Sequence, residues 1–235
     1  MTRFPEKLLL STIVAVAALI VPKQAGGQTL GFVGDVMIHS SQLRRAWLGE
    51  DDRGVDSGYD FTPTFEWFAP YLLTPDLMLG NLETTFGGPN SALVTDEKYA
   101  FREYQAYPTF TTPDSLASAL KAAGFDVMVT ANNHSMDSGL GGAARTLTVL
   151  KEEGLEATGT SRSGRPVPWR GRVGDFNLSV LAWTASVNGL IASRGMEAIN
   201  VFNARGHDGR LEEMLNDIRA EAERQPDLVI LFIHW

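Results

Sequence analysis

The sequence contains no cysteine and only four histidines among its 235 residues. A chain without cysteine forms no disulfide and offers no thiolate, so any metal site must use oxygen and imidazole ligands. The formal net charge is −8, with 28 acidic and 20 basic residues. This balance argues against a nucleic-acid partner, which requires a basic footprint, and it gives a polyanion no net attraction. A negatively charged substrate would need local cations, and bound metal is one source of them.

Long apolar runs are also absent. The run at 8–21 has fourteen residues, whereas a membrane-spanning helix needs about 20. Arg3 and Lys7 precede this run and the small residues 25–27 follow it, a pattern that is typical of a secretory signal peptide. No clean A-x-A cleavage site is present. We therefore expect 1–28 to be a signal peptide or a retained N-terminal anchor.

This interpretation sets the expected location and the domain boundary. An exported protein would be periplasmic, exposed at the cell surface or anchored in the membrane. If the leader is cleaved, the mature chain should begin between residues 25 and 30. No linker divides the remainder, so 29–235 is expected to form one domain.

Four short apolar runs end abruptly in polar side chains. Their richness in Val, Ile and Leu predicts strands that are buried on both faces. The four runs are 29–33, 76–80, 125–130 and 227–233.

Segments with the apolar spacing of helices separate these strands, at 112–124, 138–153 and 207–224. Strands that alternate with helices predict an α/β fold with a largely parallel or mixed sheet. After the second helix the pattern changes, because 172–176 and 178–183 have the pattern of antiparallel strands.

The polar residues that follow the strands are of the types that bind metals. Ligands of open α/β sheets gather at the carboxyl ends of strands, so we expect convergence of Asp35, Glu83, Asn133, His134 and His234. Carboxylate, amide oxygen and imidazole suit Mn, Fe, Zn or Mg ions and argue against copper. A carboxylate that bridges two ions would make a two-metal site.

Each of these residues also has a structural interpretation. Asp35 could end a strand or cap a helix, and His234 could be a buried core histidine. The pair Asn133 and His134, set between a buried strand and a helix start, is harder to explain by structure alone. Either of its neighbours Asp137 and Ser138 could cap the following helix.

Four motifs occur in the order and approximate spacing of one protein family. They are Gly-Asp-Val-Met at 34–37, Asn-Leu-Glu at 81–83, Ala-Asn-Asn-His at 131–134 and His-Trp at 234–235. With them the chain resembles the CapA, or PGA-cap, family of poly-γ-glutamate capsule proteins. The resemblance covers about 30–235. Each motif is weak by itself, but four in order are specific.

The resemblance implies a fold similar to calcineurin-type metallophosphoesterases, an αββα sandwich with mixed sheets and two divalent metal ions. Asp35 would bind the first ion and Glu83 would take the bridging position. Asn133 would bind the second ion, His134 would act as general acid, and His234 would be a further ligand. Three neighbours would support this site: Asn81, Asn132 and Asp137.

Two departures from the phosphoesterase pattern leave the chemistry open. Met37 stands where those enzymes have histidine, and Glu83 stands where they have aspartate. The leading hypothesis is an exported protein with a metal-dependent site that assists the synthesis or export of poly-γ-glutamate, with a membrane synthase complex as candidate partner. The alternatives are a general exported metallophosphoesterase, acting on another anionic polymer or phosphoester, and a non-catalytic scaffold that binds polymer.

The family pattern continues beyond His-Trp with a Gly-His-x-His-like segment that supplies two further imidazoles. Nothing in this sequence matches that segment, and His39 and His207 lie in the wrong context to replace it. The resemblance therefore predicts a C-terminally truncated domain that binds at least one metal weakly.

Overall fold

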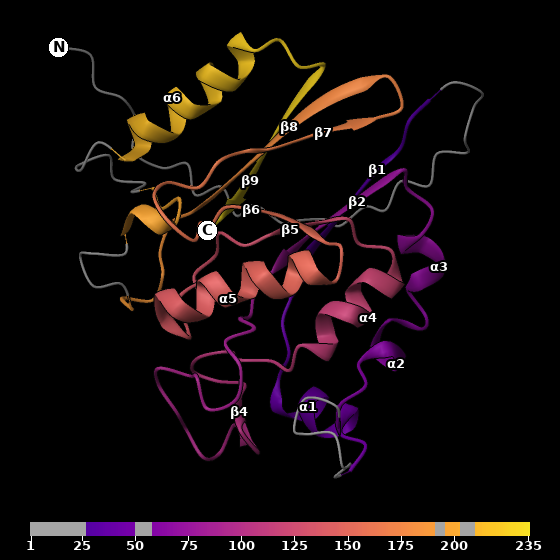
Figure 1. Ribbon diagram of the computed structural model, residues 1–235, viewed down its shortest axis with the longest axis vertical. Helices are drawn as coiled ribbons and strands as arrows, with labels where there is room; N and C mark the ends of the chain where they lie inside the picture. Colours follow the sequence, from indigo (N-terminus) through magenta and orange to yellow (C-terminus); the bar gives the residue numbers. More distant parts are fainter. Residues whose placement is uncertain (1–26, 50–57, 191–195, 203–209) are drawn as a thin grey trace, which may run out of the picture.

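The computed structural model describes residues 27–49, 58–190, 196–202 and 210–235. Most of the expected leader, and the start of the helix predicted from residue 207, lie outside these ranges. In the described part of the chain, none of the helices combines the length and the apolar content needed to cross a bilayer. The elements form four layers, helix, sheet, sheet and helix (Figure 1).

The first sheet has four parallel strands in the order β1-β2-β5-β6. Helices α4 and α5 cover its outer face (Figure 1). The bounds of these six elements are β1 Leu30–Val36, β2 Leu77–Leu82, β5 Val127–Val129, β6 Glu156–Thr158, α4 Ser115–Ala123 and α5 Gly139–Glu152.

The second sheet has three strands in the order β7-β8-β9, with β7 antiparallel and β9 parallel to β8. Helix α6 covers its outer face, and Arg170 of β7 holds the helix through two hydrogen bonds to the carboxylate of Glu221. The bounds are β7 Trp169–Val173, β8 Phe176–Thr184, β9 Leu228–His234 and α6 Arg210–Glu223.

Six short elements complete the described fold. They are α1 Ser40–Ala46, α2 Thr62–Phe65, α3 Ala69–Leu72, β3 Ala100–Phe101, β4 Tyr104–Gln105 and the 3₁₀ helix η2 Met196–Ala198.

The two-residue repeat of a strand divides β2 between two cores. Leu77 and Leu79 point inward and pack against Leu178 and Val180 of the second sheet. Met78, between them, points outward to the helices α4 and α5. The strand is therefore buried on both faces, as its unbroken apolar sequence predicts.

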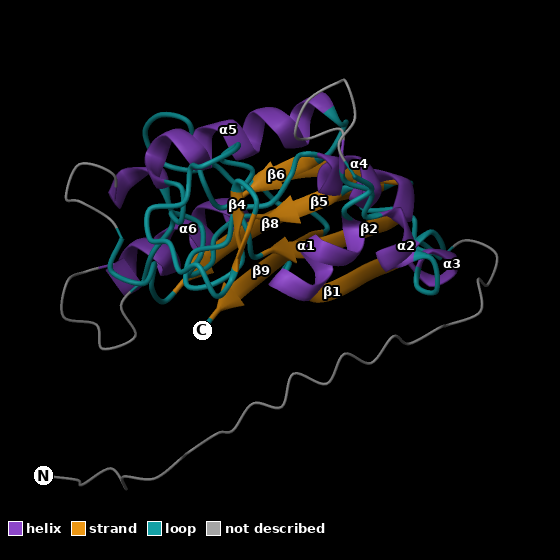
Figure 2. Ribbon diagram, turned by 90° about the horizontal axis from the view of Figure 1, so that it is seen from below, coloured by secondary structure: helices purple, strands orange, loops and turns teal. Residues whose placement is uncertain are grey.

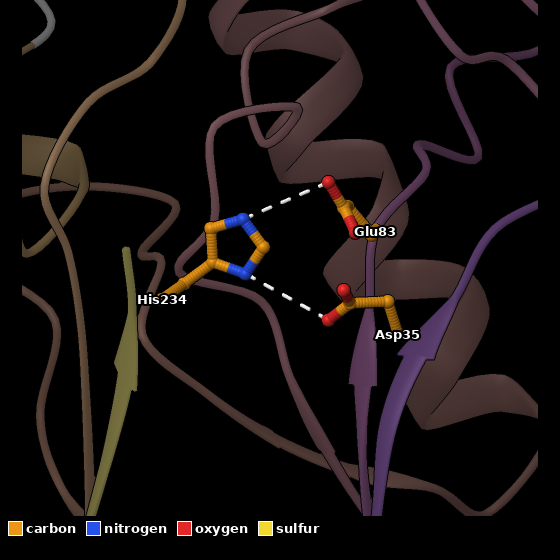
Figure 3. Close-up of side chains that lie close together, drawn as sticks. All are labelled: Asp35, Glu83 and His234. Atoms are coloured by element: carbon orange, nitrogen blue, oxygen red, sulfur yellow. Dashed lines mark ion pairs between the residues drawn. The ribbon is translucent and has the colours of Figure 1, made fainter. Parts of the chain in front are cut away.

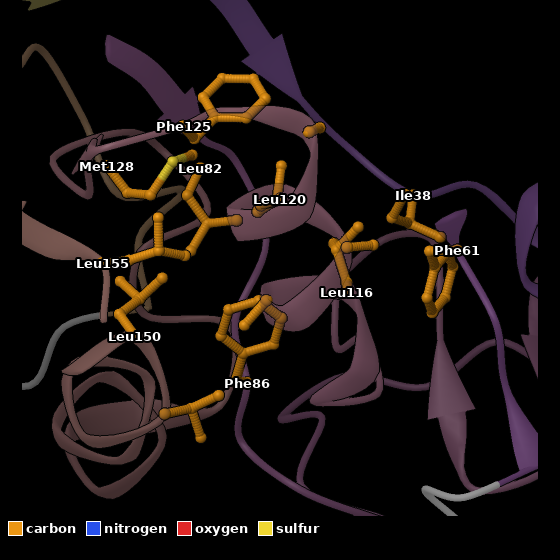
Figure 4. Close-up of a cluster of buried hydrophobic side chains, with 14 of the residues drawn as sticks. Ile38, Phe61, Leu82, Phe86, Leu116, Leu120, Phe125, Met128, Leu150 and Leu155 are labelled. Carbon is orange, nitrogen blue, oxygen red and sulfur yellow. The ribbon is translucent and has the colours of Figure 1, made fainter. Parts of the chain in front are cut away.

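The core between the first sheet and its helices is the larger one. Leu116 and Leu120 of α4 and Leu150 of α5 are fully buried there, in one cluster with Leu82 and Met128 (Figure 4). The apolar spacing along each helix puts these leucines on the face that meets the sheet.

The predicted αββα sandwich is confirmed, and two details differ from the prediction. The second sheet is mixed, and the first is wholly parallel. Its short strand β6 was not predicted, since three residues carry little periodic signal. The break between the antiparallel strands was predicted at Asn177, but the turn lies at Gly174 and Asp175, because Val173 pairs with Phe176. Gly174 has φ 58°, a conformation that glycine adopts without strain.

Replacement of Leu79 by alanine should destabilise the fold strongly. Leu79 is 0% exposed between the two sheets, so Leu79→Ala should lower the free energy of unfolding by about 2–5 kcal/mol. Val167→Ala is the control, because Val167 is 70% exposed and its loss should cost less than about 0.5 kcal/mol. Urea unfolding measures both. Equal losses for the two variants would contradict the inter-sheet core.

Candidate metal centre

The inner face of β2 changes from apolar to polar where the strand ends. Leu77 and Leu79 fill the space between the sheets, and the same two-residue repeat points Asn81 and Glu83 the same way. Both side chains are buried, with 5% of each residue exposed. The core and the candidate site therefore share one strand face.

A bulge in β1 brings Asp35 to this face. Phe32 is opposite Leu79 and Asp35 is opposite Asn81, so three residues of β1 advance against two of β2. A regular strand would place Gly34 beside Asn81 and would turn Asp35 to the outer face, because a shift of one residue reverses every side chain. The bulge therefore sets the direction of the carboxylate.

The second sheet supplies His234 from the opposite side. Ile230 and Phe232 of β9 belong to the inter-sheet core, and His234 is the next residue on that face. It pairs with Thr184 at the end of β8.

The three side chains meet closely enough to share an ion (Figure 3). One ligand atom from each of Asp35, Glu83 and His234 lies within 4.8 Å of the others. His234 Nδ1 is 3.7 Å from Asp35 Oδ1, and His234 Nε2 is 3.6 Å from Glu83 Oε1. Two ligands about 2.1 Å from a tetrahedral ion would be about 3.4 Å apart. Because the two contacts of His234 use different ring nitrogens, an ion held on one nitrogen would require the side chains to close in from their present spacing of up to 4.8 Å.

Asn81 links the strands that carry these ligands. Its Nδ2 donates to Asp35 Oδ1 at 2.7 Å and lies 3.1 Å from His234 Nδ1. Its Oδ1 accepts a hydrogen bond of 3.0 Å from Asn132 Nδ2. Asn132 Nδ2 also donates to the carbonyl oxygen of Leu82 at 2.7 Å. Asn132 is 0% exposed, so both amides are structural supports of the site.

His134 lies beside Glu83, with its Nε2 at 3.9 Å from Glu83 Oε1. Its Nδ1 is 2.7 Å from Asp137 Oδ2, and the same oxygen accepts the backbone N–H of Phe110. The Phe110 ring meets the imidazole edge to face, with ring centroids 4.7 Å apart. These contacts fix the ring and leave Nε2 directed at the site.

Burial governs the protonation of the acids. It raises the pKa of Glu83 to about 8, and the negative charge of Asp35 adds to this effect. Burial also raises the pKa of Asp137, although the hydrogen bonds from His134 and from the Phe110 backbone oppose that shift. The pKa of His234 is lowered, chiefly by burial. Without a cation, the centre therefore favours uncharged Glu83 and His234 at neutral pH.

The donor set fits a divalent ion. Carboxylates and imidazole suit the metals predicted from the sequence. Among the described contacts, none joins Asn133 to these three ligands. Its Oδ1 is buried and has no hydrogen-bond partner among the described residues, while its Nδ2 donates to Asn188 Oδ1 at 3.4 Å. A buried carbonyl oxygen without a partner is costly unless a further group satisfies it.

The predicted convergence of strand ends is confirmed for Asp35, Glu83, His134 and His234, while their roles as ligands or acid stay predictions. Asp137 does not provide the helix cap that was one interpretation, since its Oδ2 binds His134 and Phe110. The contribution of Phe110 was missed, because a phenylalanine in a loop between two motifs carries no recognisable signal.

Replacement of Glu83 by glutamine should change how stability depends on pH. In the wild type without metal, the unfolded chain loses the Glu83 proton near the ordinary pKa of 4.5, but the folded chain keeps it to about 8. The folded state therefore loses stability as pH rises between these values, by at most about 1.4 kcal/mol per pH unit. Glu83→Gln stays uncharged and should gain stability relative to the wild type over this range.

Urea unfolding in chelator at pH 5, 6.5 and 8 measures this difference. Glu156→Gln is the matched control, because Glu156 is exposed on β6 and its variant should track the wild type at every pH. A difference between Glu83→Gln and wild type that stays constant with pH would contradict the raised pKa.

Comparison with known proteins assigns the family. A family model described as bacterial capsule synthesis protein PGA_cap matches residues 29–235. The capsule biosynthesis protein CapA of Bacillus anthracis is 24% identical over 210 residues, which cover 88% of this chain and 46% of that protein. The PGA biosynthesis protein CapA of Bacillus subtilis is 24% identical over 208 residues, which cover 87% of this chain and 48% of that protein.

Two further similarities cover less or are more distant. The uncharacterized protein y4uA of Sinorhizobium fredii is 30% identical over 137 residues, 58% of this chain and 25% of that protein. Among solved structures, the sulfate thiohydrolase SoxB of Thermus thermophilus is 15% identical with a TM-score of 0.40, over 90% of this chain and 44% of that one.

This chain spans about half the length of the CapA relatives that it matches. The match to the family model nevertheless runs through every described strand and helix. The family predicted from the four motifs is thereby confirmed, and the chain belongs to the bacterial capsule synthesis protein (PGA_cap) family.

Proposed function

We propose that this protein acts in capsule synthesis through a metal-dependent site that handles poly-γ-glutamate outside the cytoplasm. The observation that carries the proposal is the cluster of Asp35, Glu83 and His234 within 4.8 Å of one another, in a chain of the capsule synthesis family. The apolar run at 8–21 with basic residues before it supports export. A membrane synthase complex is the partner that this location favours.

The charge of the chain explains why such a site would need a cation. The polymer is a polyanion and the chain carries a formal charge of −8, so the net field repels it. A divalent ion held by Asp35, Glu83 and His234 would supply a local positive charge and polarise a carbonyl or phosphoryl oxygen. The Oδ1 atom of Asn133, which has no hydrogen-bond partner among the described residues, is a candidate ligand for a second ion.

His134 is the proposed proton donor. Its Nδ1 is held by Asp137 Oδ2 at 2.7 Å, so Nε2 is the nitrogen that exchanges a proton with a leaving group in the site. The Phe110 ring limits rotation of the imidazole. This arrangement also suits hydrolysis of a phosphoester, which is the second candidate function.

Removal of one proposed ligand should weaken metal binding. Asp35→Asn keeps the shape of the side chain but removes its charge, and we expect the affinity for Mn²⁺ or Zn²⁺ to fall by at least about 100-fold. Isothermal titration calorimetry measures this affinity. The control is Asp175→Asn, because the Asp175 side chain is 98% exposed in the turn between β7 and β8. Equal affinities for the two variants would exclude Asp35 as a ligand.

Loss of the centre should also reduce capsular polymer. In the source cell, His234→Ala at the native locus should lower staining for γ-glutamyl polymer to the level of a deletion, while Asp175→Asn should leave it unchanged. Unchanged polymer in the deletion strain would contradict the capsule function.

Turnover of simple phosphodiesters by the purified protein, lost in His134→Ala, would instead favour the phosphoesterase. A metal-free protein that binds polyglutamate as well as the metal-loaded one would favour the scaffold.

A further inference from the structure

An apolar surface projects from the end of the first sheet that lies away from the metal centre. Four side chains form it, and we call it the α3 surface: Trp67, Phe68, Tyr71 and Leu73, with exposed fractions of 80%, 62%, 60% and 61%. Large aromatic side chains exposed together in this way mark a surface that contacts another phase or molecule.

Local structure forces these side chains outward. The segment makes successive helical turns, in which the backbone N–H of Tyr71 and of Leu72 both bond to the carbonyl oxygen of Phe68. Leu72 takes the inward position and is buried. Trp67 and Phe68 lie four and three residues before Tyr71, so the spacing makes the three rings neighbours, and each of these residues is at least 60% exposed.

The base of this surface is fixed by packing against α4. That helix ends at Gly124, with φ 108°, where an added Cβ would lie 3.0 Å from the carbonyl oxygen of Leu72. The lack of a side chain at Gly124 lets the α3 segment sit directly on the helix end. The exposed rings therefore project from a firmly packed turn.

Charge is nearly absent from this part of the sequence. In the fifteen residues 61–75 the only charged side chain is Glu66. Trp and Tyr prefer the headgroup region of a bilayer, where an apolar ring and a polar edge are both satisfied. A surface with one acid and no base cannot depend on anionic lipid for its attraction.

The chain enters β1 beside this surface, eight residues after the end of the apolar N-terminal run. Thr29, just before β1, is joined to Asp76, just before β2, by a backbone hydrogen bond of 2.9 Å and by two bonds to the Asp76 carboxylate. The strands β1 and β2 therefore start side by side, and α3 lies beside their starts in both views (Figures 1 and 2). The eight residues 22–29 that separate the run from β1 span at most about 30 Å.

We propose that the α3 surface rests in the headgroup region of the bilayer beside the N-terminal run. The inference rests on the proposed export and on retention of that run as an anchor, which is one of the two interpretations of residues 1–28. The run of fourteen residues is shorter than the about 20 apolar residues that span a bilayer, so the run alone anchors the protein weakly. A second apolar contact next to it strengthens the anchor, as two signals do for peripheral proteins.

The contact also sets the orientation of the protein. The metal centre lies at the carboxyl ends of β1, β2 and β9, whereas the α3 surface lies at the starts of β1 and β2. Seven residues of β1 separate the two ends by about 20 Å. The centre therefore faces away from the membrane, toward polymer in the surrounding medium.

The absence of cysteine allows a direct test. The full chain is inserted by its own N-terminal run into phosphatidylcholine vesicles that contain lipid with a nitroxide at the headgroup. A single cysteine carrying the fluorophore NBD is placed by Trp67→Cys, by Tyr71→Cys, or by the control Val167→Cys, whose side chain is 70% exposed just before β7. We expect severalfold stronger quenching at 67 and 71 than at 167, unchanged by 0.5 M NaCl. Thermal melting confirms that each variant is folded.

Four results would overturn the proposal. The first is equal quenching at positions 67 and 167, and the second is quenching that needs anionic lipid and disappears in salt. The third is an NBD probe at position 67 that is already shielded without vesicles, as contact with a second copy would cause. The fourth is failure of the full chain to bind vesicles. The metal site is tested separately, because Asp35→Asn should leave the quenching unchanged and Trp67→Cys should leave metal affinity unchanged.

Discussion

The candidate centre depends on two buried amides that must satisfy each other. Asn132 and Asn81 are 0% and 5% exposed, and a buried amide without partners is costly. Asn132 meets this requirement through hydrogen bonds to Asn81 and to the carbonyl oxygen of Leu82, both on β2. Asn81 meets it through hydrogen bonds to Asp35 on β1 and to His234 on β9. The need to pair these polar groups therefore joins strands of both sheets at the point where the ligands converge.

The core and the centre obey the same strand repeat. Side chains on one face of β2 are apolar at Leu77 and Leu79 and polar at Asn81 and Glu83. Packing of the first pair against the second sheet fixes the direction of the second pair. Changes in the inter-sheet core should therefore reach the ligands through the backbone, even at positions that touch none of them.

Much of this arrangement follows from the sequence. Apolar runs that end in Asp, Glu, Asn and His predict parallel strands with a site at their carboxyl ends, and four of the five residues expected there come together. The sequence does not reveal the bulge between Phe32 and Asp35, because its placement depends on pairing with β2. It also cannot show that Asn81, a residue type common in turns, is the amide that connects Asp35 to His234.

The order of hydrogen bonds through these amides determines the tautomer of His234. The carbonyl oxygen of Leu82 can only accept, so it fixes Nδ2 of Asn132 as donor, which in turn makes Oδ1 of Asn81 the acceptor. Nδ2 of Asn81 must then donate to His234, whose Nδ1 accepts. Neutral His234 consequently carries its proton on Nε2, facing Glu83. An ion that binds through Nε2 must displace that proton, and one that binds through Nδ1 must break the bond from Asn81.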